Sequence, residues 1–526
     1  MLTAPLLALA LAFPAQTHSP AAHPADQPAA HAPAPAERIA DYDRWYAVEM
    51  MGAKAGWMHT QLKSAGDKVT TRSKMSITMG RAGAGIEISM ASEFVESQDG
   101  KPISMRSQSK MGNDPVDTTW TFGAENVEVV TRQGGRTKTE TVPAPKGEWT
   151  TPAALEQQML ARFRAGEKRI TGKTLSPEYG LTVVSQTRTG FTDDTVTVDG
   201  QPVKALKTSV ETDAVQGVAS TEWLDAEGDL IKSETNLGGI AITMTRTSKV
   251  LAQEQADGPA PEVMVKTFVK PDKPIDDPRH SSRAVFLLTT TDGDMPALPS
   301  SAAQKVEKVD AHSARVTVDA LHPQPASPDD LKNAAFLAST VNADLADEKL
   351  TSLAAKVLKE APADKAKRAE LLRRAVYEHI SDKNLSTAMA TASEVVRSRA
   401  GDCSEHGVLL AALLRADKIP SRVATGIIYA DAFAGEKQIF GYHMWAQALL
   451  EGPDGPRWVD LDATFPPNLV FDATHIAIAH FDLGDNTINQ SLVNLAMVLG
   501  RLEVKVESVE HARPNPDKPA KDNDRK

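Results

Sequence analysis

The stretch that decides the fold is residues 399–416, RAGDCSEHGVLLAALLRA. Gly401 is a helix stop, and Asp402 starts a new helix because Asp402 and Glu405 have the spacing of a capping box. The Leu- and Ala-rich run that follows is apolar enough for the central helix of a domain. Cys403 is the one cysteine of the chain and takes the first position of this helix. The sequence therefore predicts a rigidly held thiol at the start of a central helix.

The start of a helix favours a reactive thiol, because the positive end of the helix dipole and the free N–H groups there stabilise a thiolate. A thiolate alone is a weak catalyst, since it needs a base and a group that orients the base. A lone cysteine is often only a small buried apolar residue. His406, three residues after Cys403, lies on the same helix and cannot aim its ring freely, so we interpret it as structural.

Two expected strands downstream supply a base and a carboxylate. The first expected strand is residues 440–449 (FGYHMWAQAL), which contains His443. The second is residues 457–465 (RWVDLDATF), in which alternation places Asp460 and Asp462 on the same face of the strand. The short Gly/Pro turn between the two segments predicts a hairpin. The hairpin can bring either carboxylate beside the imidazole of His443.

The segment from Ser393 to Phe465 resembles the catalytic core of the transglutaminase-like superfamily, whose members are papain-like thiol enzymes. The motifs that carry the resemblance are Gly401-Asp402-Cys403, Ile419-Pro420-Ser421-Arg422-Val423, His443-Met444-Trp445, and Trp458 with Asp462-Ala463-Thr464. The resemblance implies that Cys403 is the nucleophile, His443 the base and Asp462 the orienting acid. One departure, Asp417-Lys418 in place of an apolar residue and Gly, is expected to change only a surface turn.

The resemblance also implies a chemistry. Cys403 would attack an amide carbonyl and form a thioester, and backbone N–H groups at the start of the helix would stabilise the oxyanion. Water as acceptor gives hydrolysis and an amine gives acyl transfer. The expected partner is a protein or peptide substrate, possibly of the cell envelope, and no cofactor or metal is expected. The alternative is a non-catalytic cell-envelope binding or scaffold protein with a vestigial thiol site. The motif does not decide between acceptors and does not indicate an oligomeric state.

The predicted fold class is α+β. We expect a C-terminal transglutaminase-like domain over residues 331–509, with a central helix packed on an antiparallel sheet. It opens with helices near 347–360 and 364–380. A small β-rich segment is expected over 262–322.

The β-rich antiparallel lobes are expected over residues 41–255, where apolar and polar residues alternate with period two. A faint repeat relates the segments 93–100 and 222–228, so this region is interpreted as possibly two related sub-lobes around a helical patch near 152–165. Eight of the 16 methionines lie between Met50 and Met111. They indicate either an apolar ligand groove on a curved sheet or a flexible filler for a core poor in aromatic residues, and we favour the filler.

The ends of the chain have signals of their own. Residues 4–13 (APLLALALAF) are too short to span a bilayer, which takes about 20 residues, but they suit the apolar region of a signal peptide. We therefore expect a signal peptide over residues 1–21 and a periplasmic or secreted protein. Residues 22–40 are rich in Ala and Pro and residues 510–526 in Pro and charge, so both are expected to be disordered.

Composition narrows the function classes. The chain has 58 Lys and Arg against 69 Asp and Glu, and this net charge of −11 argues against a nucleic-acid partner. A single cysteine excludes an internal disulfide and a Cys-based zinc cluster. No stretch after the signal is long and apolar enough for a transmembrane span. The chain has no Gly-x-Ser-x-Gly elbow and no Gly-rich phosphate loop, which argues against a serine hydrolase and a nucleotide-binding enzyme.

Overall fold

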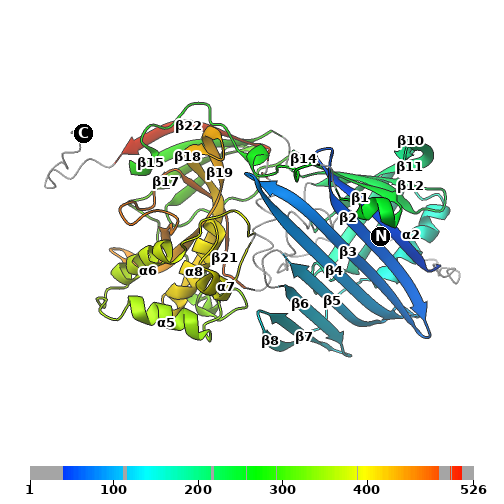
Figure 1. Ribbon diagram of the computed structural model, residues 1–526, viewed down its shortest axis with the longest axis horizontal. Coiled ribbons are helices and arrows are strands. Elements are labelled where there is room, and N and C mark those ends of the chain that lie inside the picture. Colours follow the sequence, from blue (N-terminus) through cyan, green and yellow to red (C-terminus); the bar gives the residue numbers. More distant parts are fainter. Residues whose placement is uncertain are drawn as a thin grey trace.

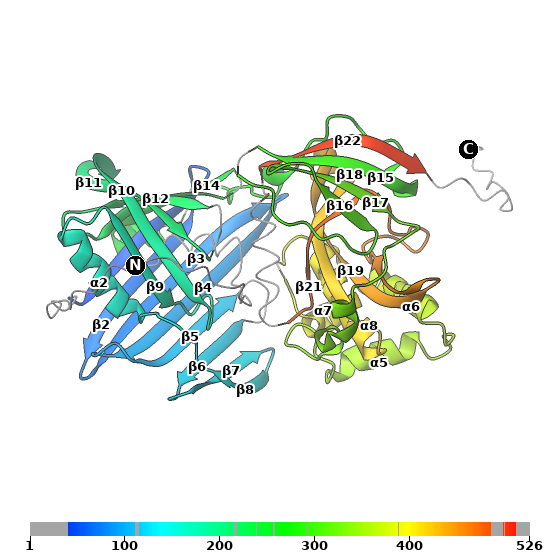
Figure 2. The ribbon, with the colours of Figure 1, turned by 180° about the vertical axis from the view of Figure 1, so that it is seen from behind.

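The computed structural model describes most of the chain between residues 40 and 511. The described residues are 40–110, 115–214, 218–237, 239–255, 258–291, 293–387, 389–484, 498 and 500–511. The expected signal peptide, almost all of the N-terminal linker and the tail after residue 511 lie outside them. An antiparallel β-rich half precedes a half in which helices pack on sheets, which is the predicted α+β class (Figures 1 and 2). No described helix has the length and apolar character needed to cross a membrane.

The N-terminal half forms one 14-stranded antiparallel sheet. Its strands are β1 (Tyr42–Met50), β2 (Ala53–Ala65), β3 (Lys68–Arg81), β4 (Ala84–Ser97), β5 (Pro102–Lys110), β6 (Val116–Phe122), β7 (Asn126–Gln133), β8 (Arg136–Pro143), β9 (Arg169–Leu175), β10 (Val183–Val198), β11 (Gln201–Thr212), β12 (Ala219–Leu224), β13 (Leu230–Leu237) and β14 (Ile240–Thr247). The strand order is β8 to β1 followed by β14 to β9. Because β1 pairs with β14, with Tyr46 opposite Arg246, the strands expected in two sub-lobes belong to one continuous sheet.

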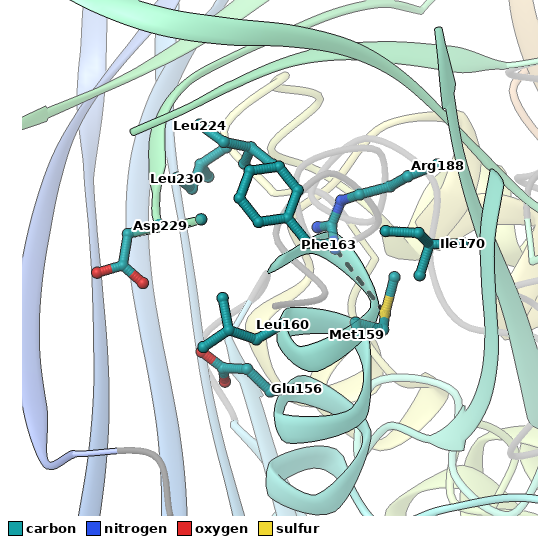
Figure 3. Close-up of a pocket in the computed structure, with 10 residues that line it drawn as sticks. Glu156, Met159, Leu160, Phe163, Ile170, Arg188, Leu224, Asp229 and Leu230 are labelled. Atoms are coloured by element: carbon teal, nitrogen blue, oxygen red, sulfur yellow. Dashed lines mark hydrogen bonds between the residues drawn. The ribbon is translucent and has the colours of Figure 1, made fainter. Parts of the chain in front are cut away.

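Helix α2 (Pro152–Arg164) occupies the predicted helical patch and packs on β9. Figure 3 shows its residues facing the sheet, with the guanidinium of Arg188 3.8 Å from the sulfur of Met159. The cavity there measures ≈ 30 Å³, which is room for one or two water molecules. It is a packing gap at the helix–sheet contact and is too small for a ligand site.

The methionines of the sheet mostly fill its core. Buried examples are Met50, Met58, Met75, Met79, Met90 and Met105. Unbranched Met side chains adapt to irregular apolar space. Five of these six lie in an apolar cluster that includes Tyr46, and Met105 lies in a second cluster.

The C-terminal half surrounds α8 (Cys403–Ala416), which is buried along nearly its whole length. Helices α5 (Glu348–Val357), α6 (Lys365–His379) and α7 (Ala392–Ser398) cover it. On another side it packs on a four-stranded antiparallel sheet in the order β20-β19-β18-β21. These strands are β18 (Ser421–Phe433), β19 (Glu436–Gly452), β20 (Gly455–Leu461) and β21 (His475–Phe481). The predicted central helix on an antiparallel sheet is therefore present.

Local chemistry fixes where α8 begins. The carboxylate of Asp402 accepts the N–H of Ser404 at 3.0 Å, and that of Glu405 accepts the N–H of Asp402 at 2.9 Å. This is the predicted capping box. Gly401 has φ +146°, a conformation that side chains disfavour, and a Cβ there would collide with the side chain of Glu405. A glycine, an N-cap and a buried glutamate together hold Cys403 in place.

A second four-stranded sheet in the C-terminal half joins the expected β-rich segment 262–322 to the end of the expected domain 331–509. Its order is β16 (Gln304–Lys308), β17 (Ser313–Asp319), β15 (Ser281–Thr290) and β22 (Leu502–His511). The last described strand thus pairs with a strand more than 200 residues earlier. The two sheets share a core in which the rings of Phe286 and Phe440 meet edge to face, 5.7 Å apart. Residues 262–322 therefore pack as part of the same body as the helices.

This arrangement predicts the outcome of limited proteolysis. Residues from about 262 to about 511 should stay together as one unit under native conditions. Even if the chain is cut near residues 323–330, β15 and β22 remain paired and hold the two pieces together. The measurement is mass spectrometry of fragments after gel filtration under native conditions. Separation of a free 331–509 fragment from 262–322 would show that the shared core does not hold the two segments together.

Candidate active site

The thiol of Cys403 lies at the start of α8, on the wall of a cavity that His443 also lines. The side chain is half-buried. Its sulfur accepts a hydrogen bond from the backbone N–H of Met444, the residue after His443 on β19. The helix start and the middle of β19 thus place the thiol and the imidazole on the wall of one cavity.

The imidazole of His443 is fixed from its other side by Asp462. Nε2 of His443 donates to Oδ2 of Asp462 at 2.8 Å, which leaves Nδ1 as the nitrogen free to exchange a proton. The other oxygen of Asp462 accepts from both the N–H and the hydroxyl of Thr464, at 2.8 and 2.7 Å. Arg373, buried on α6, donates to the backbone carbonyl of Asp462 at 3.1 Å. Both carboxylate oxygens and the backbone carbonyl of Asp462 are therefore anchored.

Asp460, the other candidate carboxylate, has different partners. It accepts from the indole N–H of Trp445 at 2.8 Å, the amide of Gln447 at 2.5 Å and the backbone N–H of Ala303 at 3.2 Å. Asp460 and Asp462 point to different partners because β20 ends at Leu461, and the alternation of side chains along the strand therefore stops before Asp462. The structure brings Asp462, and not Asp460, to the imidazole.

A second histidine binds the same carboxylate. Nε2 of His475, at the start of β21, lies 3.2 Å from Oδ2 of Asp462, and Nδ1 lies 3.3 Å from the carboxylate of Asp472. Burial disfavours a charge on His475, but Asp472 and Asp462 more than offset it and raise the pKa of His475 to about 9. His475 is therefore an imidazolium at neutral pH. Burial raises the pKa of Asp462, but His443 and, to a smaller extent, His475 more than offset burial and hold this pKa well below its usual range.

The charge state of the thiol differs from the expectation of a preformed thiolate. Burial raises the pKa of Cys403 well above its ordinary value, and the neighbouring carboxylate of Asp402 raises it further. The guanidinium of Arg81 and the N–H of Met444 act in the opposite direction. The effects of burial and of Asp402 on the pKa of Cys403 are larger than those of Arg81 and Met444. The thiol therefore carries its proton until a base removes it.

Arg81 reaches this site from the N-terminal sheet. It stands at the end of β3, and its guanidinium donates to the carboxylate of Asp402 at 2.6 Å and to the carbonyl of Thr387 at 2.8 Å. A residue from the opposite half of the chain thus holds the N-cap next to the thiol.

Sequence reasoning missed His475 and Arg81. A signal for the first was present, because Asp472-Ala473-Thr474 repeats Asp462-Ala463-Thr464 ten residues later. Both copies make the same turn, with the threonine N–H and hydroxyl donating to one aspartate oxygen. No local signal marks Arg81, because its role depends on how two distant halves meet. His406 is buried on α8, where its Nδ1 bonds the carbonyl of Asp402 at 2.6 Å.

One group among the described residues has the spacing of metal ligands. Nε2 of His443, Oδ2 of Asp462 and Nε2 of His475 lie within 4.8 Å of one another. Two imidazoles and a carboxylate are a common ligand set for divalent metals. The hydrogen bonds that these atoms make with each other already explain their arrangement, so we assign no metal here.

A comparison with known families gives a match over part of the chain. Residues 351–463 match the model of the transglutaminase-like superfamily, a segment that includes Cys403, His443 and Asp462. The chain contains a transglutaminase-like domain. A comparison with curated proteins gave no match.

Two solved structures are similar to parts of the chain. A β-barrel-like protein of DUF1849, a domain of unknown function, from Brucella abortus has a TM-score of 0.32 and 13% identity, covering 40% of this chain and 98% of that one. The periplasmic domain of TgpA from Pseudomonas aeruginosa, bound to ethylmercury, has a TM-score of 0.25 and 16% identity, covering 38% of this chain and 88% of that one.

The buried imidazolium gives a prediction on pH and stability. Replacing His475 by Gln should lower the free energy of unfolding most at pH values near 6, where the contribution of the imidazolium is fully present below an unfolded pKa of about 6.5. That contribution is lost as the pH rises through the folded pKa of about 9. Urea denaturation of both proteins at about pH 6 and about pH 10 measures the change.

The control is His322→Gln, because the side chain of His322 is 79% exposed. This variant should match the wild type at both pH values. If the difference between wild type and His475→Gln is the same at both pH values, His475 is not a buried cation.

Proposed function

We propose that this protein is an exported transglutaminase-like cysteine enzyme that acts on amide bonds of proteins or peptides through a thioester, by hydrolysis or acyl transfer. One observation carries the proposal. The thiol of Cys403 and the imidazole of His443 line one cavity, while Asp462 binds the imidazole nitrogen that faces away from the reaction. A nucleophile, a base and a group that orients the base are the three parts that such chemistry needs.

The proposed reaction begins with proton transfer. Nδ1 of His443 takes the proton of the Cys403 thiol as the sulfur attacks the amide carbonyl carbon. The C–N bond then breaks, and the imidazolium returns its proton to the leaving amine. In the second half a water molecule or an amine gives a proton to Nδ1, attacks the thioester and releases the thiol. The raised pKa of Cys403 favours this concerted removal over a resting ion pair.

The oxyanion is expected to form at the start of α8. The backbone N–H of Cys403 is in the first turn, where helix N–H groups have no partner within the helix. The hydrogen bonds of the described residues give this N–H no acceptor. It is therefore free to donate to a developing negative charge.

The mutational pattern tests the triad. Cys403→Ala and His443→Ala should abolish thioester formation, because the chain has no second thiol and His443 is the base in the proposed reaction. Asp462→Asn should slow kcat by a factor on the order of 10⁴, since it permits the wrong imidazole tautomer. The three losses should not add, because the residues act as one unit. The measurement is acylation and turnover of p-nitrophenyl acyl esters by each purified variant.

Asp460→Asn is the matched control for Asp462→Asn. It removes a buried carboxylate of the same hairpin that does not touch His443, so it should cost stability, about 1–3 kcal/mol, and little activity. The variants are compared at a temperature at which all of them are folded. A dead Asp460→Asn with an active Asp462→Asn would contradict the assignment. A wild-type thiol that no ester or iodoacetamide modifies would favour the scaffold alternative.

Export is tested separately. We propose that the mature protein is periplasmic or secreted and begins near residues 13–22, after removal of the signal peptide. N-terminal sequencing of the protein recovered from the periplasmic or culture fraction measures this directly. A mature chain that keeps Met1 in that fraction would show that residues 1–21 are not a cleaved signal.

A further inference from the structure

The cavity at Cys403 is much larger than attack on one amide bond requires. Its volume is ≈ 810 Å³, near the upper end of the range of about 300–1,000 Å³ for small-molecule sites. It lies between the two halves of the protein. The N-terminal sheet contributes Met79 of β3, Ile86 and Ile88 of β4 and Ile240 of β14 to its wall.

The cavity is also long. It is lined along the hairpin of β18 and β19, from Gly441–Met444 beside the thiol to Phe433 near the tip. Gly426 of β18 pairs with His443, and Phe433 lies seven residues further along the same strand. At about 3.4 Å per residue the wall therefore runs for about 24 Å away from the catalytic imidazole.

The cavity lining combines a few charged side chains with many apolar ones. Near the thiol, Arg81 pairs with Asp402, and the ammonium of Lys383 lies over the ring of Tyr377, 3.2 Å from its centroid. Most of the other lining side chains are apolar. They include Met79, Ile86, Ile88, Ile240, Val263, Ile428, Ala430, Phe433 and Ile439. The charged exceptions are Asp431, which is exposed on the hairpin, and Arg279, which is paired with Asp472.

We propose that this cavity binds a long unbranched acyl chain, and that the substrate is an N-acylated peptide whose fatty acyl carbonyl is the carbon attacked by Cys403. This inference rests on the proposed function. With C–C bonds of about 1.5 Å, an extended chain of about 16 carbons is about 19 Å long and fits beside the hairpin. An aliphatic chain has no polar atoms to satisfy. A bare peptide would bury an N–H and a C=O at every residue against walls that offer few partners.

The proposed reaction needs only the N-acylated peptide and an acceptor, which is water or an amine. The Cys403 sulfur forms a bond to the acyl carbon, the C–N bond to the peptide amine breaks, and the thiol proton passes through His443 to that amine. Water or a second amine then takes the acyl group from the sulfur. No electrons are transferred to or from the protein.

Binding is tested apart from catalysis with Cys403→Ala in the full-length chain, titrated with cis-parinaric acid, a fluorescent long-chain fatty acid. We expect saturable binding. Adding Ala430→Trp should weaken it at least about tenfold, because the indole fills the cavity beside β18. The control Leu321→Trp, at a residue 60% exposed and outside the cavity, should leave binding unchanged. If Ala430→Trp does not fold, Ala432→Trp, at an exposed lining position further out, replaces it.

Catalysis is tested with the wild-type protein and p-nitrophenyl esters from acetate to dodecanoate, each below its micelle concentration. The acylation rate constant should rise about fourfold for each added methylene, until the chain fills the cavity. Ala430→Trp should flatten this dependence, and the control Leu321→Trp should retain it.

The outcomes separate this inference from the proposed function. No parinarate binding, or equal rates for acetate and dodecanoate, overturns the acyl site while Cys403 acylation still supports the thioester chemistry. Parinarate binding with no acylation by any ester defeats the thioester chemistry and, with it, the substrate assignment. Binding together with a rising chain-length series that Ala430→Trp abolishes supports both.

Discussion

The carboxylate of Asp462 is the contact on which the rest of the site depends. It is buried, it accepts from His443 and His475 through one oxygen and from Thr464 through the other, and Arg373 holds its backbone. A buried carboxylate is tolerated only when cations and donors surround it. In return it fixes the tautomer and the direction of the His443 ring. His443 and, to a smaller extent, His475 keep Asp462 ionised, so it remains a charged acceptor.

The N-terminal sheet contributes residues to the same site. Arg81 from β3 holds the N-cap beside the thiol, and Met79, Ile86 and Ile88 close a cavity that the catalytic half alone would leave open. The transglutaminase-like domain thus contributes Cys403 and His443 to this cavity, and the sheet contributes one wall and the guanidinium of Arg81. This wall also explains the raised thiol pKa, because a wall that excludes water disfavours a thiolate.

Local sequence signals were enough for much of this structure. The capping box at Asp402, the helix that begins at Asp364 and the period-two strands of the sheet follow from contacts within a few residues. The choice between Asp460 and Asp462 came from the family motif, because strand alternation put both on one face. The long-range pairings of β1 with β14 and of β15 with β22 could not be predicted, since many strands share the same pattern and only tertiary packing selects the partner. Arg81 was missed for the same reason, whereas the repeated Asp-Ala-Thr before His475 was a local signal that was not used.

The most direct test of the account is the protonation state of His443 itself. Nitrogen NMR of the histidine-labelled protein, assigned by comparison with His443→Gln, reports which ring nitrogen carries the proton. The account predicts the tautomer with its proton on Nε2, bonded to Asp462. It also predicts that this form is lost in Asp462→Asn and kept in Asp460→Asn. A proton on Nδ1 in the wild type, or no change in Asp462→Asn, would contradict the claim that Asp462 sets up the catalytic base.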